Sequence, residues 1–206
     1  MKRILSAAFL IVGMTASGTV WAADVIEEWA TIKPAAPTLK PVTVDPKTTA
    51  LLMLDFMKQN CRQRPRCVAS LPAMKKLLES ARAAKATIIY SIIANSKIED
   101  VLPEVAVQEG EPSVLSGPDK FRNTDLEKIL KDKGIQAVIA VGTSSNGAVL
   151  YTASGAAFRG MKVIVPVDGM SAIDPVAEYA TVLNFLSAPT VSAATTLTRS
   201  DMIKFQ

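Results

Sequence analysis

The chain has 206 residues, a formal net charge of +4 and 49% hydrophobic residues, which suits one globular domain rather than several. Two of the positive charges, Lys2 and Arg3, lie in an N-terminal segment that we expect to be removed, so the rest of the chain carries 4 − 2 = +2. This mild charge, without a basic stripe that alternates with aromatic residues, argues against a nucleic-acid-binding protein.

The first 22 residues have the three-part layout of a secretory signal peptide. Lys2 and Arg3 precede a mostly apolar run over residues 4–14, and Val20-Trp21-Ala22 supplies a small-x-small cleavage site. A retained N-terminal anchor is the alternative, but the apolar run is too short for a comfortable membrane span. We therefore expect residues 1–22 to be removed and the chain to be exported, periplasmic or secreted, without membrane attachment afterwards.

Residues 23–47 are polar and contain four prolines. This composition predicts an extended N-terminal arm rather than a second domain. Within it, Trp29 beside the acidic Glu27 and Glu28 is compatible with a short helix that packs on the core. The folded domain is then expected over residues 48–206.

The first predicted strand of that domain, residues 48–55, is an apolar run that ends in Asp55. A carboxylate at the carboxyl end of a buried strand lies at the mouth of the sheet, where ligands bind in open α/β folds. The alternative is that Asp55 only caps the following turn, as many aspartates do. The strand alone favours the cap.

Cys61 and Cys67 are the only two cysteines of the chain. In an exported protein, an even pair this close predicts a disulfide that closes a small loop. The chain-entropy relation gives such a short ring roughly 2 kcal/mol of stabilisation. The competing interpretation is that Cys61 is a reactive thiol, but the sequence contains no histidine to activate it. The arginines between the two cysteines are either solvated or face an anionic substrate.

Helices and strands alternate over the next 80 residues. The predicted elements are a helix over 71–85, a strand over 86–93, an acidic loop over 95–112, a short strand over 113–115 and a helix over 124–133. Thr124 and Glu127 have the spacing of a capping box at the start of that last helix. Lys120 precedes it in a Gly-Pro-Asp turn, and a lone lysine in a turn is normally solvated.

A βαβ unit forms the centre of the domain. Residues 137–141 are an unbroken apolar run, typical of a strand that is buried on both faces. Gly142 ends it, a small-residue turn follows, and apolar residues then recur at helical spacing until Gly160. A second buried strand is predicted over 162–167, a helix over 174–185 and a last strand over 189–197. Free N–H groups at the start of the central helix can hold an anion, although many such turns bind nothing.

These elements, taken in order, resemble a known family. The segments that carry the resemblance are the strand ending in Asp55, G-P-D-K-F-R-N-T-D-L-E-K-I-L from Gly117, V-I-A-V-G-T-S-S-N-G-A-V-L-Y-T-A from Val138, and R-G-M-K-V-I-V-P-V-D from Arg159. The chain resembles the isochorismatase-like hydrolases, also called the cysteine hydrolases. The resemblance implies an α/β three-layer sandwich with a mostly parallel, six-stranded, doubly wound sheet and helices on both faces.

The resemblance also implies that Asp55 and Lys120 meet at the carboxyl edge of the sheet as catalytic residues. The family's G-x-x-T-N-x-C-V pattern places its nucleophilic cysteine at Ala148, which has no nucleophilic group and excludes a covalent acyl-enzyme there. Ser144 and Ser145 are possible substitutes, but a serine nucleophile needs a base within reach. Family members that hydrolyse nicotinamide use a metal held largely by histidines. Without histidine we expect no metal and no cofactor.

One reaction of the family needs no nucleophile, because isochorismatases hydrolyse a vinyl ether by protonating its methylene carbon. Asp55 would then be the general acid, and Lys120 would either orient the substrate or pair with its carboxylate. The expected pocket is lined by substrate-binding residues that flank these two groups and the turn. These are Phe56, Gln59, Phe121, Ser144, Asn146 and Gly147.

Two functions remain open at this point. One is a hydrolase that acts on a small polar or anionic molecule through Asp55 and Lys120. The other is a non-catalytic binding or structural protein that kept the fold and lost the thiol at Ala148. In both cases the expected partner is a small molecule, with no nucleic acid, and a homo-oligomer is possible.

Overall fold

The structure is a computed structural model that describes residues 24–206. The predicted signal peptide, residues 1–22, lies outside the described residues. Residues 37–206 form one compact unit, so the second half of the predicted arm belongs to the domain. Residues 24–36 form a unit of their own, in which the Asp24 carboxylate accepts a 2.8 Å hydrogen bond from the Ile26 N–H. In the described part of the chain, no helix combines the length and apolar character needed to cross a bilayer.

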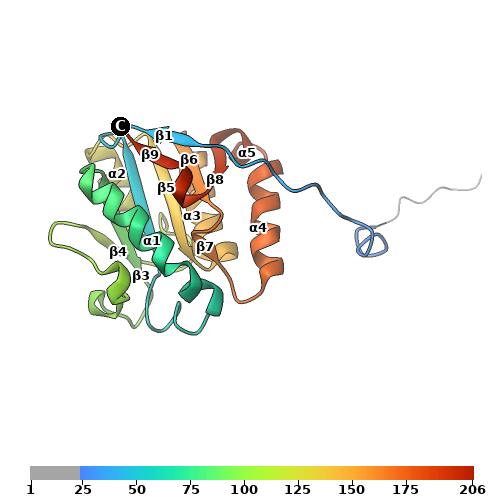
Figure 1. Cartoon of the computed structure of the whole chain (residues 1–206), viewed down its shortest axis with the longest axis horizontal. Helices are drawn as coiled ribbons and strands as arrows, with labels where there is room; N and C mark the ends of the chain where they lie inside the picture. The colour runs from blue at the N-terminus through green and yellow to red at the C-terminus, as the bar shows by residue number, and fades with distance from the viewer. Residues whose placement is uncertain (1–23) are drawn as a thin grey trace, which may run out of the picture. The chain divides into compact units, whose positions relative to one another are not determined.

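The domain is built on a parallel sheet whose strands lie in the order β4-β3-β2-β5-β6-β8 (Figure 1). Their bounds are Thr49–Leu54 (β2), Thr87–Ile92 (β3), Ser113–Leu115 (β4), Ala137–Thr143 (β5), Lys162–Pro166 (β6) and Thr195–Thr198 (β8). All six residues of β2 are buried, because helices cover both faces of the sheet and each strand therefore reads as a continuous apolar run. A two-residue strand, β7 (Met170–Ser171), extends the sheet by pairing with the end of β5.

Two hydrophobic clusters separate the helices into layers. On one face, α1 (Pro65–Ala83) packs with Met53 and Val141, and it crosses in front of the sheet in Figure 1. The other face packs against four helices. These are α2 (Leu126–Asp132), α3 (Leu150–Phe158), α4 (Pro175–Ser187) and α5 (Val191–Ala194). The predicted three-layer α/β fold with a mostly parallel sheet is therefore confirmed.

The chain order explains where a ligand can bind. From β2 the chain moves outward to β3 and β4, and it then returns to the other side of β2 to form β5, β6 and β8. The switch point thus lies between β2 and β5. In open α/β sheets, the crevice outside the carboxyl ends of the strands at such a point is the usual ligand site.

Several predicted boundaries were wrong. Helix α1 begins at Pro65, six residues before the predicted start, with the proline in the first turn where its missing N–H costs nothing. The capping box on α2 does not form, since Asp125 is the N-cap and the Glu127 carboxylate instead binds Lys131 and Arg159. The predicted last strand over 189–197 begins only at Thr195, because residues 191–194 form α5.

A second, two-stranded sheet was not predicted. Strand β1 (Val42–Val44) pairs in parallel with β9 (Ile203–Phe205), so the start and the end of the compact unit are hydrogen-bonded to each other. Val44 and Ile203 belong to the hydrophobic cluster on the α1 face. Four short helical turns complete the described part of the chain. They are η1 (Ile98–Asp100), η2 (Pro103–Val105), η3 (Ser145–Val149) and η4 (Ser200–Met202).

Candidate active site

The site is formed where three parallel strands end together. Leu54, the last residue of β2, is in register with Ser91 of β3 and with Gly142 of β5. Gly142 has a φ of +150°, and an added Cβ would lie 2.1 Å from the Leu54 carbonyl oxygen, so only glycine allows the two strands to approach this closely. Asp55 follows at once with a φ of +56°, a left-handed conformation that aspartate tolerates better than most residues.

Asp55 and Lys120 form a buried ion pair over this edge. The Lys120 Nζ lies 2.8 Å from Asp55 Oδ2 and also donates a 2.8 Å hydrogen bond to the Gly117 carbonyl oxygen. The hydroxyl of Ser91 donates to the other carboxylate oxygen at 2.6 Å. Both Asp55 oxygens therefore have a hydrogen-bond partner, which fixes the orientation of the carboxyl group.

Lys120 is not the solvated turn residue that its local sequence favours. Its side chain is fully buried, with 0% exposure. The Lys120 N–H donates to Thr152 Oγ1 at 3.3 Å, which fixes the loop against α3. Burying an ammonium group costs several kcal/mol unless it is paired, so this lysine is held inside the protein by Asp55.

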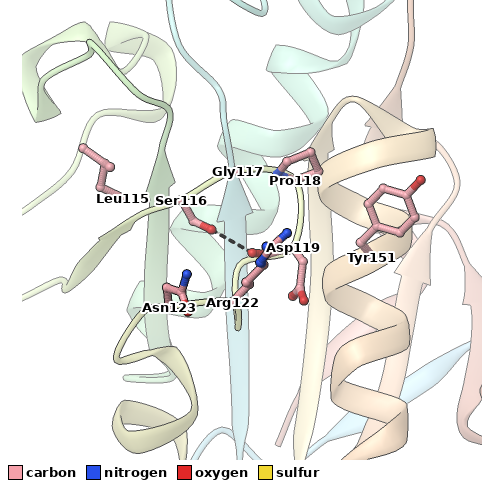
Figure 2. A pocket seen from close by; sticks show the side chains of 8 residues that line it. All are labelled: Leu115, Ser116, Gly117, Pro118, Asp119, Arg122, Asn123 and Tyr151. Atoms are coloured by element: carbon pink, nitrogen blue, oxygen red, sulfur yellow. Dashed lines mark hydrogen bonds between the residues drawn. The ribbon is translucent and has the colours of Figure 1, made fainter.

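A cavity of about 410 Å³ opens beside Asp55. Its lining residues are Asp55, Asn60, Ile93, Ala94, Ser116, Gly117, Pro118, Ser144 and Ala148. A neighbouring pocket of about 450 Å³ shares the Ser116–Pro118 segment and lies toward Arg122 and Tyr151 (Figure 2). The hydroxyl of Ser116 donates to the Asp119 carbonyl oxygen at 2.7 Å and stabilises the loop between the two pockets.

The structure brings together only part of the predicted pocket. Asp55, Ser144 and Ala148 line the cavity, and Lys120 lies behind Asp55. Five predicted substrate-binding residues are not part of the wall. These are Phe56, Gln59, Phe121, Asn146 and Gly147.

The reasons for these corrections are local. Phe56 is turned into the core on the α1 face, because the left-handed turn at Asp55 sends the two side chains apart. Phe121 packs beneath the Arg159 guanidinium, 4.2 Å from its ring centre. Gln59 and Asn146 are exposed. The Gly147 N–H already donates to the Ser144 carbonyl oxygen and is not a free donor.

The turn after β5 presents a methyl group and a hydroxyl to the cavity. It is the π-helical turn η3, which leads directly into α3. Ala148 is 3% exposed and lines the wall together with Ser144. Ser145 instead points toward α4, where its Oγ lies 3.5 Å from Thr181 Oγ1.

The predicted disulfide between Cys61 and Cys67 is present. The ring that it closes lies against the end of β5. Asn60, next to the ring, donates to the Thr143 carbonyl oxygen at 3.3 Å, and Arg64 donates to Thr143 Oγ1 at 2.8 Å. Sequence reasoning missed Asn60 as a wall residue, although an amide five residues after Asp55 was a visible signal.

A histidine-held metal does not fit this site, because the sequence contains no histidine. Among residues 24–206, no three histidine, cysteine, aspartate or glutamate side chains gather in a way that would hold a metal ion. The polar groups beside Asp55 are instead hydroxyl, amide and ammonium groups, which suit an organic ligand.

The isochorismatase domain profile matches residues 49–198, which is most of the chain. The chain belongs to the isochorismatase family. Its relatives include a protein described as "Secreted isochorismatase effector Isc1" from Verticillium dahliae. That protein is 28% identical over 144 residues, and the match covers 63% of this chain and 76% of the relative.

Solved structures share the fold of this isochorismatase-family chain. A cysteine hydrolase from Pseudomonas syringae pv. phaseolicola superimposes with a TM-score of 0.69 at 19% identity, covering 81% of this chain and 95% of the other. An N-carbamoylsarcosine amidase from Thermoplasma acidophilum gives 0.63 at 22% identity, covering 75% and 97%. At these identities the likeness concerns the fold alone.

Proposed function

We propose that this isochorismatase-family chain is a hydrolase that acts on a small polar or anionic molecule by acid–base chemistry at Asp55. The observation that carries this proposal is the buried Asp55–Lys120 pair, 2.8 Å apart at the switch point of the sheet and beside an open cavity. A protein selected only for stability gains little from burying such a pair. The pair therefore fits a functional role better than a structural one.

The proposed reaction proceeds without a covalent cysteine intermediate. Ala148 stands where the family pattern places its thiol, and the two cysteines of the chain are joined in a disulfide. The family reaction that is compatible with this arrangement is the hydrolysis of a vinyl ether. It requires a proton donor and a water molecule rather than a nucleophilic side chain.

In this reaction Asp55 gives up one proton and later takes one back. The protonated carboxyl group gives its proton to the methylene carbon of the vinyl ether, which leaves an oxocarbenium-like centre. Water adds to that centre and returns one proton to the carboxylate, and the hemiketal then breaks into an alcohol and a ketone. Lys120 and Ser91 hold the carboxylate in place throughout, and the ammonium group stabilises the anion formed after proton transfer.

Export is part of the same proposal. The N-terminal segment has the layout of a signal peptide, the chain holds a disulfide, and one relative is described as secreted. Disulfides persist in oxidising compartments such as the periplasm and the extracellular space. We therefore place the mature hydrolase in one of these.

The decisive experiment assays the purified protein on small vinyl ethers, with isochorismate first, and compares Asp55→Asn with the wild type. Loss of a general acid removes about 100- to 10,000-fold of rate. The exposed Asp132→Asn is the matched control and should keep full activity. Wild-type activity should survive iodoacetamide and metal chelators, since no free thiol exists in the described chain. Equal rates for Asp55→Asn and the wild type would contradict the proposal.

A second candidate function is supported by Ala148 itself. The methyl group at the family's nucleophile position favours a protein that binds a small molecule without transforming it. Among residues 24–206, no hydrogen bond joins the Ser144 hydroxyl to a side-chain base, which argues against Ser144 as a replacement for the thiol. In that case ligands would bind in the cavity, and no member of a substrate panel would be turned over.

A further inference from the structure

The disulfide ring places an arginine beside the site without giving it a carboxylate partner. Of the ring's three arginines, Arg66 pairs with Glu178, whose Oε1 lies 2.7 Å from its Nε. Arg62 is exposed at the surface. Arg64 is half-buried and, within the described residues, forms no ion pair within 4.0 Å. A partly desolvated guanidinium normally has an anionic partner, so Arg64 requires an explanation.

The surroundings of Arg64 connect it with the cavity. Its Nη1 donates a 2.8 Å hydrogen bond to Thr143 Oγ1, and Thr143 immediately precedes Ser144 in the wall. Asn60 belongs to the same wall and donates to the backbone of the same threonine. Burial lowers the pKa of the Arg64 guanidinium, and the negative charge of Asp55 partly opposes this effect, so the two groups lie within each other's field.

Arg64 also has donors to spare. A guanidinium carries five N–H groups in a planar fork, and one hydrogen bond from this side chain is formed within residues 24–206. The other nitrogens are not among the buried polar atoms that lack a partner, which means that they reach solvent. A fork that is fixed on one side and open on the other matches the two oxygens of a carboxylate.

We propose that Arg64, held in place by the Cys61–Cys67 ring, recognises a carboxylate of a small substrate at the rim of the Asp55 cavity. The proposal rests on the proposed function and extends its site, because it assigns the substrate to the class of small carboxylates. The ring then has a task beyond stability. It fixes Arg64 against Thr143 before any ligand arrives, which reduces the ordering cost of binding.

The test uses benzoate and its neutral isostere benzamide as probes, titrated into the protein by calorimetry or NMR. Wild type should bind benzoate more tightly than benzamide. Arg64→Gln should lose about ten- to hundredfold in benzoate affinity, the usual cost of a hydrogen bond to a charged group, while benzamide affinity stays unchanged. Arg64→Lys should keep part of the preference, since it retains the charge without the fork. Arg62→Gln makes the same charge change on the same ring and should bind like the wild type.

The ring is tested with Cys61→Ser/Cys67→Ser, because both cysteines are fully buried and a reductant would reach them poorly. This variant should lose benzoate affinity by a factor similar to that of Arg64→Gln, and combining both changes should cause no further loss. Circular dichroism confirms that each variant is folded.

The proposal is overturned if the wild type does not prefer benzoate, or if Arg64→Gln and Arg62→Gln behave alike. If the losses of benzoate affinity from the ring variant and from Arg64→Gln add up in the combined variant, the ring acts independently of Arg64. That result would overturn the proposed role of the ring. None of these binding results depends on turnover. A failure here is therefore distinct from a failure of Asp55 chemistry, which the rate of Asp55→Asn decides.

Discussion

At the scale of single residues, the Asp55–Lys120 pair dominates the energetics of the site. Both side chains are almost fully buried, at 5% and 0% exposure. Lys120→Met leaves an uncompensated buried carboxylate and should lower the free energy of unfolding by about 3–5 kcal/mol. Asp55→Asn/Lys120→Met removes both charges and should recover most of this loss. Urea denaturation of the wild type, both single variants and the double variant measures the coupling, and additive losses would contradict it.

A substitution at Ser171, in contrast, should not lower the free energy of unfolding. Its hydroxyl is buried at the end of β7 and has no hydrogen-bond partner among the described residues. An unsatisfied buried polar group costs about 1–3 kcal/mol. Ser171→Ala should therefore leave the free energy of unfolding unchanged or raise it by about 1 kcal/mol. Ser91→Ala is the control, because it removes a donor to Asp55 and should destabilise the protein in the same urea experiment.

At the scale of elements, the turn η3 can be tested by restoring a thiol. Ala148 lies in η3, shortly before α3, and lines the cavity together with Asp55, whose carboxylate pairs with Lys120. The cation and the helix start both favour a thiolate, so the thiol in Ala148→Cys should react with iodoacetamide faster than free cysteine does at pH 7. Ala153→Cys, whose position in α3 is fully buried, should stay unreactive. Mass spectrometry of the alkylated protein follows both rates, and an inert thiol in the first variant would contradict the arrangement proposed for this turn.

The contact between α2 and α3 should respond to pH. Hydrogen bonds from Lys131 and then Arg159 lower the pKa of Glu127 from 4.5 to about 2. A carboxyl group whose pKa is lowered by folding stabilises the native state above its unfolded pKa, and that contribution is lost as the pH falls. The loss should therefore lie between about pH 4.5 and pH 2. The melting temperatures of the wild type and Glu127→Gln should therefore converge as the pH falls through this window. A difference that stays constant with pH would contradict the proposed role of Glu127.

At the scale of the whole molecule, the sequence predicted the layers better than the edges. Strands β2, β3, β5 and β6 are buried on both faces, so their apolar runs were visible without any partner. Strands β1 and β9 have three residues each and depend on a partner about 160 residues away, since Val42 pairs with Ile203. No local pattern announces such a pairing.

The site residues likewise divide into those that the sequence indicates and those that only the tertiary structure places. Asp55 and Lys120 were found because the order of three motifs resembles a family, although the turn around Lys120 alone predicts a solvated side chain. Ser91 was missed, since a serine inside an apolar strand has no distinguishing spacing. Asn60 was missed, and the role of Arg64 was left open between a solvated side chain and one that faces an anionic substrate. The positions of both depend on how the disulfide ring lies against Thr143, which is a matter of tertiary packing.

The pairing of β1 with β9 has a consequence for how the chain folds. Residues 42–44 must wait for residues 203–205, which lie far along the chain, before their hydrogen bonds can form. Pairing β1 with β9 directly from the unfolded chain is slow because it closes a very long loop. The pairing becomes easier once the six-stranded core has formed and has brought β1 and β9 close together. This small sheet should therefore be the last part to form and the first to open. Its amide hydrogens should exchange with solvent well before those of β5.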